Sequence, residues 1–340
     1  MTREERMVIE RMSRGGIPPR DIAAAMGRHR RTIERELKRG SVMHLDTELR
    51  EKHVYSSDRG QDVHDLKALA KGPGLKIGGY DEVAEFIRWR IVECREAPDV
   101  VAYRMKQAGT AVAVCTKTLY NYIDRKLIPG VGNESLWEKR FRRNQSRRRV
   151  RRLPKRLSRG PGIEQRPEEV EGREVFGHWE MDLVVGPTRR SNTALLTLVE
   201  RKHRRIIIRR IPDKTQESVL KAIRGIERQY GARRFRRIFK TITVDNGSEF
   251  LDFEALKTSA LSRKQRTRIF YAHPYSSWER GSNENANRMI RRFVAKGMDI
   301  ARFTRKRIGE IEAWINDYPR KLLEFMTPNE LFAKELKAIL

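Results

Sequence analysis

Short apolar stripes alternate with glycine and proline over the first forty residues, a pattern typical of short helices separated by tight turns. The first stripe ends at Gly15-Gly16, and Pro18-Pro19 opens a second helix that Gly27 stops. A third, basic helix runs from about Arg30 to Lys38. A helix, a glycine-containing turn and a basic helix predict a helix-turn-helix, which we expect over residues 1–45.

Apolar positions at helical spacing recur after residue 80. They mark one helix over 83–91, a second that begins at Pro98, and a third over 118–123. This order predicts a second helix-turn-helix-like helical domain over 80–130. The polar stretch between the two domains, 46–79, is expected to be a partly irregular linker.

Runs rich in β-branched residues take over after about residue 173. They predict strands over 178–185, 194–200, 205–211, 241–244 and 267–271. Helices are expected over 215–230, 284–293, 304–316 and 328–339. Three meandering strands followed by alternating helix and strand describe a mixed α/β sheet of the ribonuclease-H type over 173–340, although periodicity alone does not fix that fold.

The charge balance points to a polyanionic partner. The chain carries 74 Lys and Arg against 45 Asp and Glu, a net charge of +29, which is far more than solubility requires. Nucleic acid is the first candidate. An anionic membrane is the second, but the sequence has no apolar run of roughly 18 residues and no signal peptide. We therefore expect a cytoplasmic, nucleoid-associated protein with no membrane contact and no small-molecule substrate.

Two further features bear on the organisation of the chain. About a dozen Lys and Arg residues crowd the stretch 139–159, which predicts a basic arm, disordered or folding on binding, within a linker over 131–172; the alternative is a merely solvated linker. Cys94 and Cys115 form neither a disulfide framework nor a zinc set. They fit a reducing cytosol and are expected to be buried core thiols.

Three acidic residues stand where chemistry could occur. Asp182 lies inside the first predicted strand, Asp245 ends the fourth, and Glu284 sits near a helix start. A buried aspartate is costly unless it is neutralised, and a pair of Mg²⁺ ions, which prefer carboxylate oxygens, would do so. The alternatives are a buried ion pair for Asp182 and a turn cap for Asp245. Glu180 shares the strand face of Asp182, and we expect it to pair with an arginine.

Four segments carry a resemblance to a known family. They are His178–Asp182, Leu198–Arg201, Asp245–Phe250 and His273–Asn285. Together they closely resemble the insertion-sequence-thirty family of transposases, and the last segment is the most specific. The likeness extends over nearly the whole chain. It implies a catalytic domain of the retroviral-integrase type.

The resemblance also assigns the metal ligands. It places the family's Asp-Asp-Glu set on Asp182, Asp245 and Glu284, as both catalytic and metal-binding residues. Glu284 follows Asp245 by 39 residues, somewhat more than is usual in such enzymes, and the surplus lies in the basic stretch 262–266. Counting back by the usual spacing would select Glu279, but the Asn-Glu-Asn motif defines the ligand.

The implied function is a DNA transposase that binds the terminal inverted repeats of an insertion sequence and cuts and joins DNA strands. Water attacks one phosphodiester to free a 3′-hydroxyl, which then attacks a second phosphodiester. Two Mg²⁺ ions are expected, with Mn²⁺ able to substitute. The partners would be double-stranded DNA and a second copy in a homodimer or larger assembly. Two alternatives stay open, a ribonuclease-H-like nuclease or resolvase and a non-catalytic helix-turn-helix regulator.

DNA contacts are expected from two places. Arg280 could hold a phosphate near the catalytic acids, whereas Trp278 beside it is expected to pack. His178 and His273 are expected to be structural. The presumed recognition helix and its approach supply the remaining DNA-binding candidates: Arg28, Arg30, Arg31, Thr32, Arg35 and Lys38.

Overall fold

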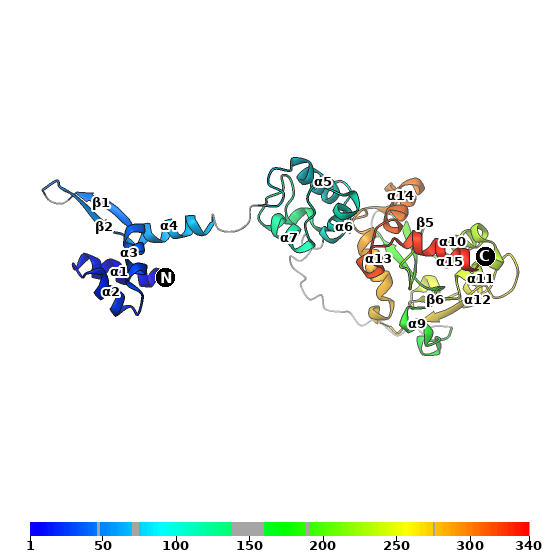
Figure 1. Ribbon diagram of the computed structural model, residues 1–340. Coiled ribbons are helices and arrows are strands. Elements are labelled where there is room, and N and C mark those ends of the chain that lie inside the picture. The colour runs from blue at the N-terminus through cyan, green and yellow to red at the C-terminus, as the bar shows by residue number, and fades with distance from the viewer. Residues whose placement is uncertain (46–47, 70–74, 138–159, 188–190, 275, 340) are drawn as a thin grey trace. The chain divides into compact units, whose positions relative to one another are not determined.

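The computed structural model describes residues 1–45, 48–69, 75–137, 160–187, 191–274 and 276–339 (Figure 1). The chain divides into two compact units, Met1–Gly79 and Tyr80–Leu340. In the part of the chain that is described, no helix is long and apolar enough to cross a membrane. The predicted basic arm over 139–159 lies outside the described residues.

The first unit begins with the three predicted helices: α1 Arg3–Arg14, α2 Pro19–Ala25 and α3 Arg30–Arg39. Each contributes one fully buried isoleucine to a shared core, namely Ile9, Ile22 and Ile33. Gly27 turns the chain between α2 and α3 with a φ of +58°, a backbone conformation that glycine adopts without strain. The helix-turn-helix predicted from the sequence is therefore present.

The described residues of the stretch predicted as a linker, 46–79, include regular elements, which corrects the prediction of a linker there. The stretch contains the hairpin strand β2 (Glu51–Tyr55), paired with β1 (Ser41–Leu45), and helix α4 (Ser57–Leu69). Tyr55 packs into the core with Ile9, Ile22 and Ile33, and polar contacts also hold the stretch to the first helices. The Tyr55 hydroxyl donates to Glu36 at 3.3 Å, and the Ser57 backbone N–H donates to Glu10 at 3.2 Å. A periodicity search for apolar positions does not detect such contacts.

The second unit opens with three helices in the predicted order: α5 Asp81–Val92, α6 Pro98–Ala108 and α7 Thr116–Asp124. We call them the α5–α7 module. The Trp314 indole N–H donates to the Cys94 carbonyl at 3.1 Å, and the Ala97 N–H donates to the Tyr318 hydroxyl at 2.9 Å. Cys94 is half-buried and Cys115 is exposed, so the prediction of buried thiols is wrong for Cys115, which stands at the N-cap of α7.

A five-stranded sheet forms the centre of the second unit. Its strands are β3 His178–Val185, β4 Ala194–Glu200, β5 Ile206–Ile211, β6 Thr241–Val244 and β7 Arg268–Tyr271. The strand order is β5-β4-β3-β6-β7, with β3, β4 and β5 antiparallel and β6 and β7 parallel to β3. This is the mixed α/β sheet that the sequence predicted.

Helices cover both faces of the sheet (Figure 1). The main ones are α10 Gln216–Tyr230, α11 Ala232–Ile238, α13 Gly281–Ile290, α14 Arg305–Asn316 and α15 Pro328–Ile339. Alternation along β4 separates the two cores: Leu196 and Leu198 pack with α10, α11 and α15, whereas Leu195 and Val199 pack with α13 and α14. The face of the sheet under α13 is the one on which the catalytic candidates lie.

Shorter segments link these elements. They are η1 Asn133–Ser135, η2 Ile163–Gln165, α9 Glu169–Gly172, η3 Ser248–Phe250, α12 Phe253–Lys257, η4 Ser277–Arg280, η5 Ile300–Arg302 and η6 Lys321–Leu323. η4 leads directly into α13, so the loop after β7 delivers the start of that helix to the sheet.

Candidate functional site

Strand register brings Asp182 and Asp245 together. The parallel pairing of β3 with β6 matches Glu180 to Thr243. Two residues further on, Asp182 and Asp245 therefore lie on the same face of two neighbouring strands, whose backbones are about 4.8 Å apart. Asp182 is still inside β3, whereas Asp245 has just left β6 and is more exposed.

One arginine bridges the two carboxylates. Arg280 Nη1 lies 3.2 Å from Asp182 Oδ1, and Arg280 Nη2 lies 3.2 Å from Asp245 Oδ2. Burial raises the pKa of Asp182, and the neighbouring Asp245 carboxylate raises it further, while Arg280 acts in the opposite direction. Two like charges at this spacing repel each other, so a cation between them stabilises the arrangement.

Glu284 is on the helix above, but it does not join the pair. It is exposed on α13, one turn before Asn287, whose side-chain N–H donates to Asp182 Oδ2 at 2.8 Å. Positions 284 and 287 lie on one side of a helix, so Glu284 faces the same region. Among the described residues, no group of three His, Cys, Asp or Glu side chains is placed to hold a metal ion.

The donor atoms around Asp182 nevertheless suit a hard divalent cation. Asp182 and Asp245 offer carboxylate oxygens, the ligands that Mg²⁺ prefers. The Asn287 side-chain oxygen is buried and has no hydrogen-bond partner, and a buried polar atom left in this way is uncommon. Arg280 supplies the positive charge that a metal would otherwise supply. The type of donor atom and the charge of these residues therefore fit a divalent cation.

Glu180 behaves as the sequence predicted. It is fully buried, and its Oε1 accepts from Arg201 Nη1 at 2.7 Å. Its other oxygen accepts from the backbone N–H of Asn283 at 2.9 Å. The expected salt bridge is confirmed, and its second bond ties the first turn of α13 to β3, which positions Glu284 and Asn287.

The loop before α13 separates Glu279 from the acids. Glu279 accepts from the His273 ring at 2.7 Å and from its backbone N–H at 2.8 Å, and so points to the end of β7. The Glu279 carboxylate at the ring, together with Glu164, raises the pKa of His273. Trp278 is 72% exposed, so the prediction that it packs is wrong. An exposed indole beside the acids is free to stack on another molecule.

The recognition-helix candidates all lie on the surface of the first unit. Arg28, Arg30, Arg31, Thr32, Arg35 and Lys38 are exposed, whereas Ile33 and Glu36 face the core. Two of the six are already paired: Arg28 with Glu5 at 2.8 Å and Arg30 with Glu34 at 2.7 Å. The others carry no ion pair with the described residues and leave a basic stripe along α3.

Two site features escaped the sequence analysis. It assigned Arg280 to phosphate alone, and no sequence signal pointed to the contacts of Arg280 with Asp182 and Asp245, because Arg280 precedes the helix that was predicted to begin at Glu284. It also treated the basic stretch 262–266 as an insertion. There the Arg266 guanidinium is buried and pairs with buried Glu227 at 3.1 Å. No local pattern marks this pair, because its two residues are far apart along the chain.

Two family models match the chain. Residues 172–277 match the integrase core domain, and residues 1–40 match a helix-turn-helix domain. Among solved structures, the catalytic core of BIV integrase matches at 18% identity with a TM-score of 0.37, covering 48% of this chain and 98% of that chain.

Curated relatives cover almost the whole chain. A probable transposase for the insertion-like sequence element IS1161 of Streptococcus salivarius is 31% identical over 98% of this chain and 94% of its own length. The transposase for IS4351 of Bacteroides fragilis is also 31% identical, over 98% and 95%. The transposase InsI for IS30C of Escherichia coli is 32% identical over 52% and 43%. The chain therefore belongs to the insertion-sequence transposases, a family that includes those of IS30, and it is a DNA-acting enzyme with a helix-turn-helix and a ribonuclease-H-like core of the integrase type.

Proposed function

We propose that Asp182, Asp245 and Glu284 are the catalytic, metal-binding residues with which this transposase cuts and joins DNA. The observation that carries the proposal is the single cation bridging Asp182 and Asp245, on the face of the sheet that α13 covers. Glu284 lies on the same side of α13 as Asn287, which already contacts Asp182. Loss of the Arg280 bridge would open the space between the three acids.

The proposed cofactor is Mg²⁺, with Mn²⁺ as a substitute, held by Asp182, Asp245 and Glu284. Divalent ions in such a set activate the attacking oxygen and stabilise the leaving one. The side-chain oxygen of Asn287 would complete the donor set. Glu180 bonds to Arg201 and to the Asn283 backbone, and so holds the first turn of α13 against β3. No protein nucleophile is required, because water and then a 3′-hydroxyl are the attacking groups.

Arg280 and Trp278 would hold the DNA at the acids. Once released from the two aspartates, the Arg280 guanidinium can bind a phosphate with two parallel hydrogen bonds. The exposed Trp278 ring can stack on a base beside it. Both residues lie in η4, directly before Glu284, so this short segment would couple DNA contact to assembly of the three acids.

End recognition is proposed for the first unit. The basic stripe of α3 has the exposure required of a helix that enters the major groove, and the element's terminal inverted repeats would be its target. Because two ends must be joined, we propose a homodimer or a larger assembly as the working form. Chromosomal DNA as substrate places it in the bacterial cytoplasm, at the nucleoid.

The test mixes purified protein with labelled linear element ends, Mg²⁺ and a plasmid target. Asp182→Asn and Glu284→Gln should lose joined products while DNA binding persists, and Glu279→Gln should keep them. If Asp182→Asn joins as well as the wild type, the catalytic assignment is wrong. If Glu279→Gln rather than Glu284→Gln abolishes joining, the third acid is misassigned. A wild type that cuts but never joins would favour the nuclease alternative.

A further inference from the structure

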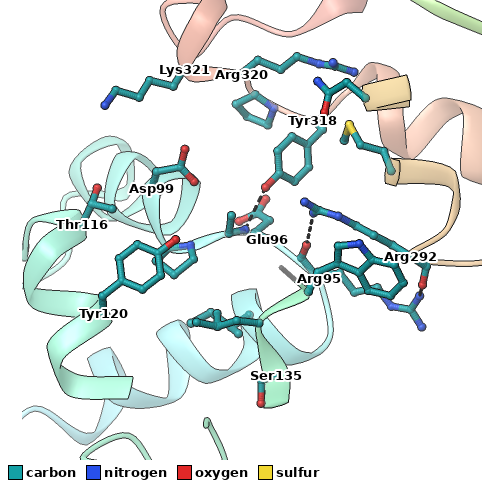
Figure 2. A pocket seen from close by; sticks show the side chains of 18 of the residues that line it. Arg95, Glu96, Asp99, Thr116, Tyr120, Ser135, Arg292, Tyr318, Arg320 and Lys321 are labelled. Carbon is teal, nitrogen blue, oxygen red and sulfur yellow. Dashed lines mark hydrogen bonds between the residues drawn. The ribbon is translucent and has the colours of Figure 1, made fainter. Parts of the chain in front are cut away.

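A cavity of about 920 Å³ lies in the second unit, between the α5–α7 module and the segment Tyr318–Leu322 (Figure 2). α13 forms part of its wall through Asn285 and Met289. Figure 2 shows the Lys321 and Arg320 side chains on one side of the cavity, with Tyr120 and Thr116 opposite. Neither the catalytic proposal nor the recognition helix uses this space.

Five cations line the cavity: Arg95, Arg204, Arg292, Arg320 and Lys321. None of them lies within ion-pair distance of a carboxylate among the described residues. Their hydrogen bonds go to neutral oxygens. Arg95 and Arg292 each donate to the other's backbone carbonyl, Arg204 donates to the Ser282 hydroxyl, and Arg320 donates to the Ile315 carbonyl. These bonds hold the guanidinium groups in place without neutralising them.

The acidic residues of the lining do not offset that charge. Glu96 is buried and pairs with Arg90 at 3.3 Å and Arg104 at 3.6 Å, two arginines that do not line the cavity. Asp99 accepts from the Val100 backbone N–H at the start of α6. Glu134 is the third acid in the lining. The cavity is therefore cationic overall.

Crowding of these cations costs free energy that an anion would recover. Burial, together with the nearby Arg204 and Arg292, lowers the pKa of Arg320 to about 10. Burial also lowers the pKa of Arg204, as do Arg173 and Arg201, two arginines outside the cavity lining. Cations that are held close together and partly desolvated without a counter-charge form a ready anion site.

The lining also offers flat aromatic surfaces. Tyr120 and Trp137 contribute to it, whereas the Tyr318 ring, which also lines the cavity, is buried against Trp314. Aromatic faces interleaved with cations are typical of sites for single-stranded nucleic acid, in which bases stack and phosphates meet arginine or lysine. A cavity of this volume is in the size range of small-molecule sites, so it takes nucleotides of one strand and excludes a duplex.

The position of the cavity connects it to the proposed catalytic acids. Asn285 and Met289 are four residues apart on the cavity side of α13, whereas Glu284 and Asn287 lie toward Asp182. A helix is about 10 Å across. The cavity and the proposed catalytic acids therefore lie on different sides of one helix, on the order of one helix diameter apart.

We infer that this cavity binds a single DNA strand, by its phosphates and bases, next to the phosphodiester that is cut. The inference rests on the proposed catalytic site, because only strand cutting there gives the cavity its substrate. It assigns the segment Tyr318–Leu322 and the α5–α7 module a joint role in holding an unpaired strand. Duplex recognition stays with the first unit.

The experiment compares the affinity of the full chain for a blunt duplex and for the same duplex with a 3′ single-stranded tail, by fluorescence anisotropy at fixed salt. The cavity variant is Arg95→Gln/Lys321→Gln. The control is Arg305→Gln/Lys306→Gln, which removes one arginine and one lysine from α14. All four side chains are exposed, but Arg95 also donates to the Arg292 carbonyl, so thermal melts of both variants check that a loss of tail binding is not a loss of fold.

The wild type and the control should prefer the tailed duplex, and the cavity variant should lose roughly tenfold of that preference while binding blunt duplex unchanged. Equal preference in the cavity variant and the control would overturn the inference, as would a wild type with no preference for the tail. Asp182→Asn separates the two proposals. The Asp182→Asn variant should keep the preference for the tailed duplex while losing strand joining. If this variant still joins strands, the catalytic proposal fails, whether or not the preference for the tailed duplex is kept.

Discussion

Arg280 Nη1 lies 3.2 Å from Asp182 Oδ1, and the other end of the same guanidinium lies 3.2 Å from Asp245. The side chain that the sequence offers as a phosphate ligand thus occupies the space between the two aspartates. In the absence of a divalent ion, this contact prevents the two carboxylates from repelling each other. A metal would have to displace it.

Removal of Arg280 should therefore tighten metal binding in the absence of DNA. Arg280→Gln removes a competing cation about 3 Å from both carboxylates, and we expect an affinity for Mn²⁺ on the order of tenfold higher. Isothermal titration calorimetry and the Mn²⁺ electron paramagnetic resonance signal measure this without reference to activity. Arg305→Gln, which removes an exposed charge from α14, should leave the affinity unchanged. A weaker affinity in Arg280→Gln would show that Arg280 organises the acids instead of competing.

Along α3, Arg35 should contribute to DNA binding more than its paired neighbours do. Arg28 and Arg30 already have carboxylate partners. Breaking those ion pairs would offset part of the binding free energy that each arginine contributes on contact with DNA. Arg35→Ala should cost about 1–3 kcal/mol if it reads a base, or lower the salt slope by about 1 if it meets a phosphate. Electrophoretic mobility shifts with an element end at several salt concentrations distinguish the two.

The matched control for this helix is Arg59→Ala, which removes an exposed arginine from α4 in the same unit. Equal losses of affinity in Arg35→Ala and Arg59→Ala would indicate a diffuse electrostatic effect. The recognition role of α3 would then have no support.

Most of the longer strands and helices of the second unit were predictable because they are long enough to show their period. β3, β4 and β6 begin and end where the apolar runs do. α11 was missed because its few buried residues, such as Phe235 and Ile238, are interleaved with arginines that hide the stripe. α4 was missed because charge and hydroxyl contacts, not apolar spacing, hold it in place.

The candidate site was predictable only in part, for a similar reason. A carboxylate inside an apolar strand signals a cost that something must offset, so Asp182 stands out from sequence alone. The cation that offsets the cost of burying Asp182 depends on the register of β3 with β6 and on where α13 packs over the sheet. These are properties of the folded chain, so the bridge formed by Arg280 could not be predicted.

Buried Arg266 should be a major contributor to the stability of the core. Its guanidinium pairs with Glu227 at 3.1 Å and donates to the Leu256 carbonyl at 2.8 Å, with both ion-pair side chains fully buried. Arg266→Met leaves Glu227 buried and unpaired, and we expect a loss of about 3–5 kcal/mol in the free energy of unfolding. Urea denaturation measures it.

Two further variants test whether the unpaired charge is the cause. Arg266→Met/Glu227→Gln removes the buried charge and should recover much of the stability. Lys264→Met, an exposed neighbour, should change it by no more than about 0.5 kcal/mol. A double variant as unstable as Arg266→Met would mean that packing, not charge, explains the loss.

His178 should make stability depend on pH in a defined window. Its ring is buried at the start of β3, where Nδ1 is 2.8 Å from the Thr241 hydroxyl, and burial lowers its pKa to about 4. In the unfolded chain the ring takes up a proton below about pH 6.5. The unfolded state therefore binds more protons between pH 6.5 and 4, and the unfolding free energy falls over that window as the pH drops, by up to about 3 kcal/mol.

Glu200 acts in the opposite direction over almost the same window. Burial raises its pKa to about 7, so its contribution to stability is present at low pH and is lost as the pH rises from about 4.5 to 7. Wild-type stability alone would therefore hide both effects. His178→Asn keeps a side-chain N–H near Thr241 but cannot titrate. The measurement is the difference in unfolding free energy between wild type and His178→Asn, taken in urea from pH 7 to pH 4. This difference should shrink by about 3 kcal/mol toward low pH. Parallel curves would show that His178 is already protonated in the folded chain.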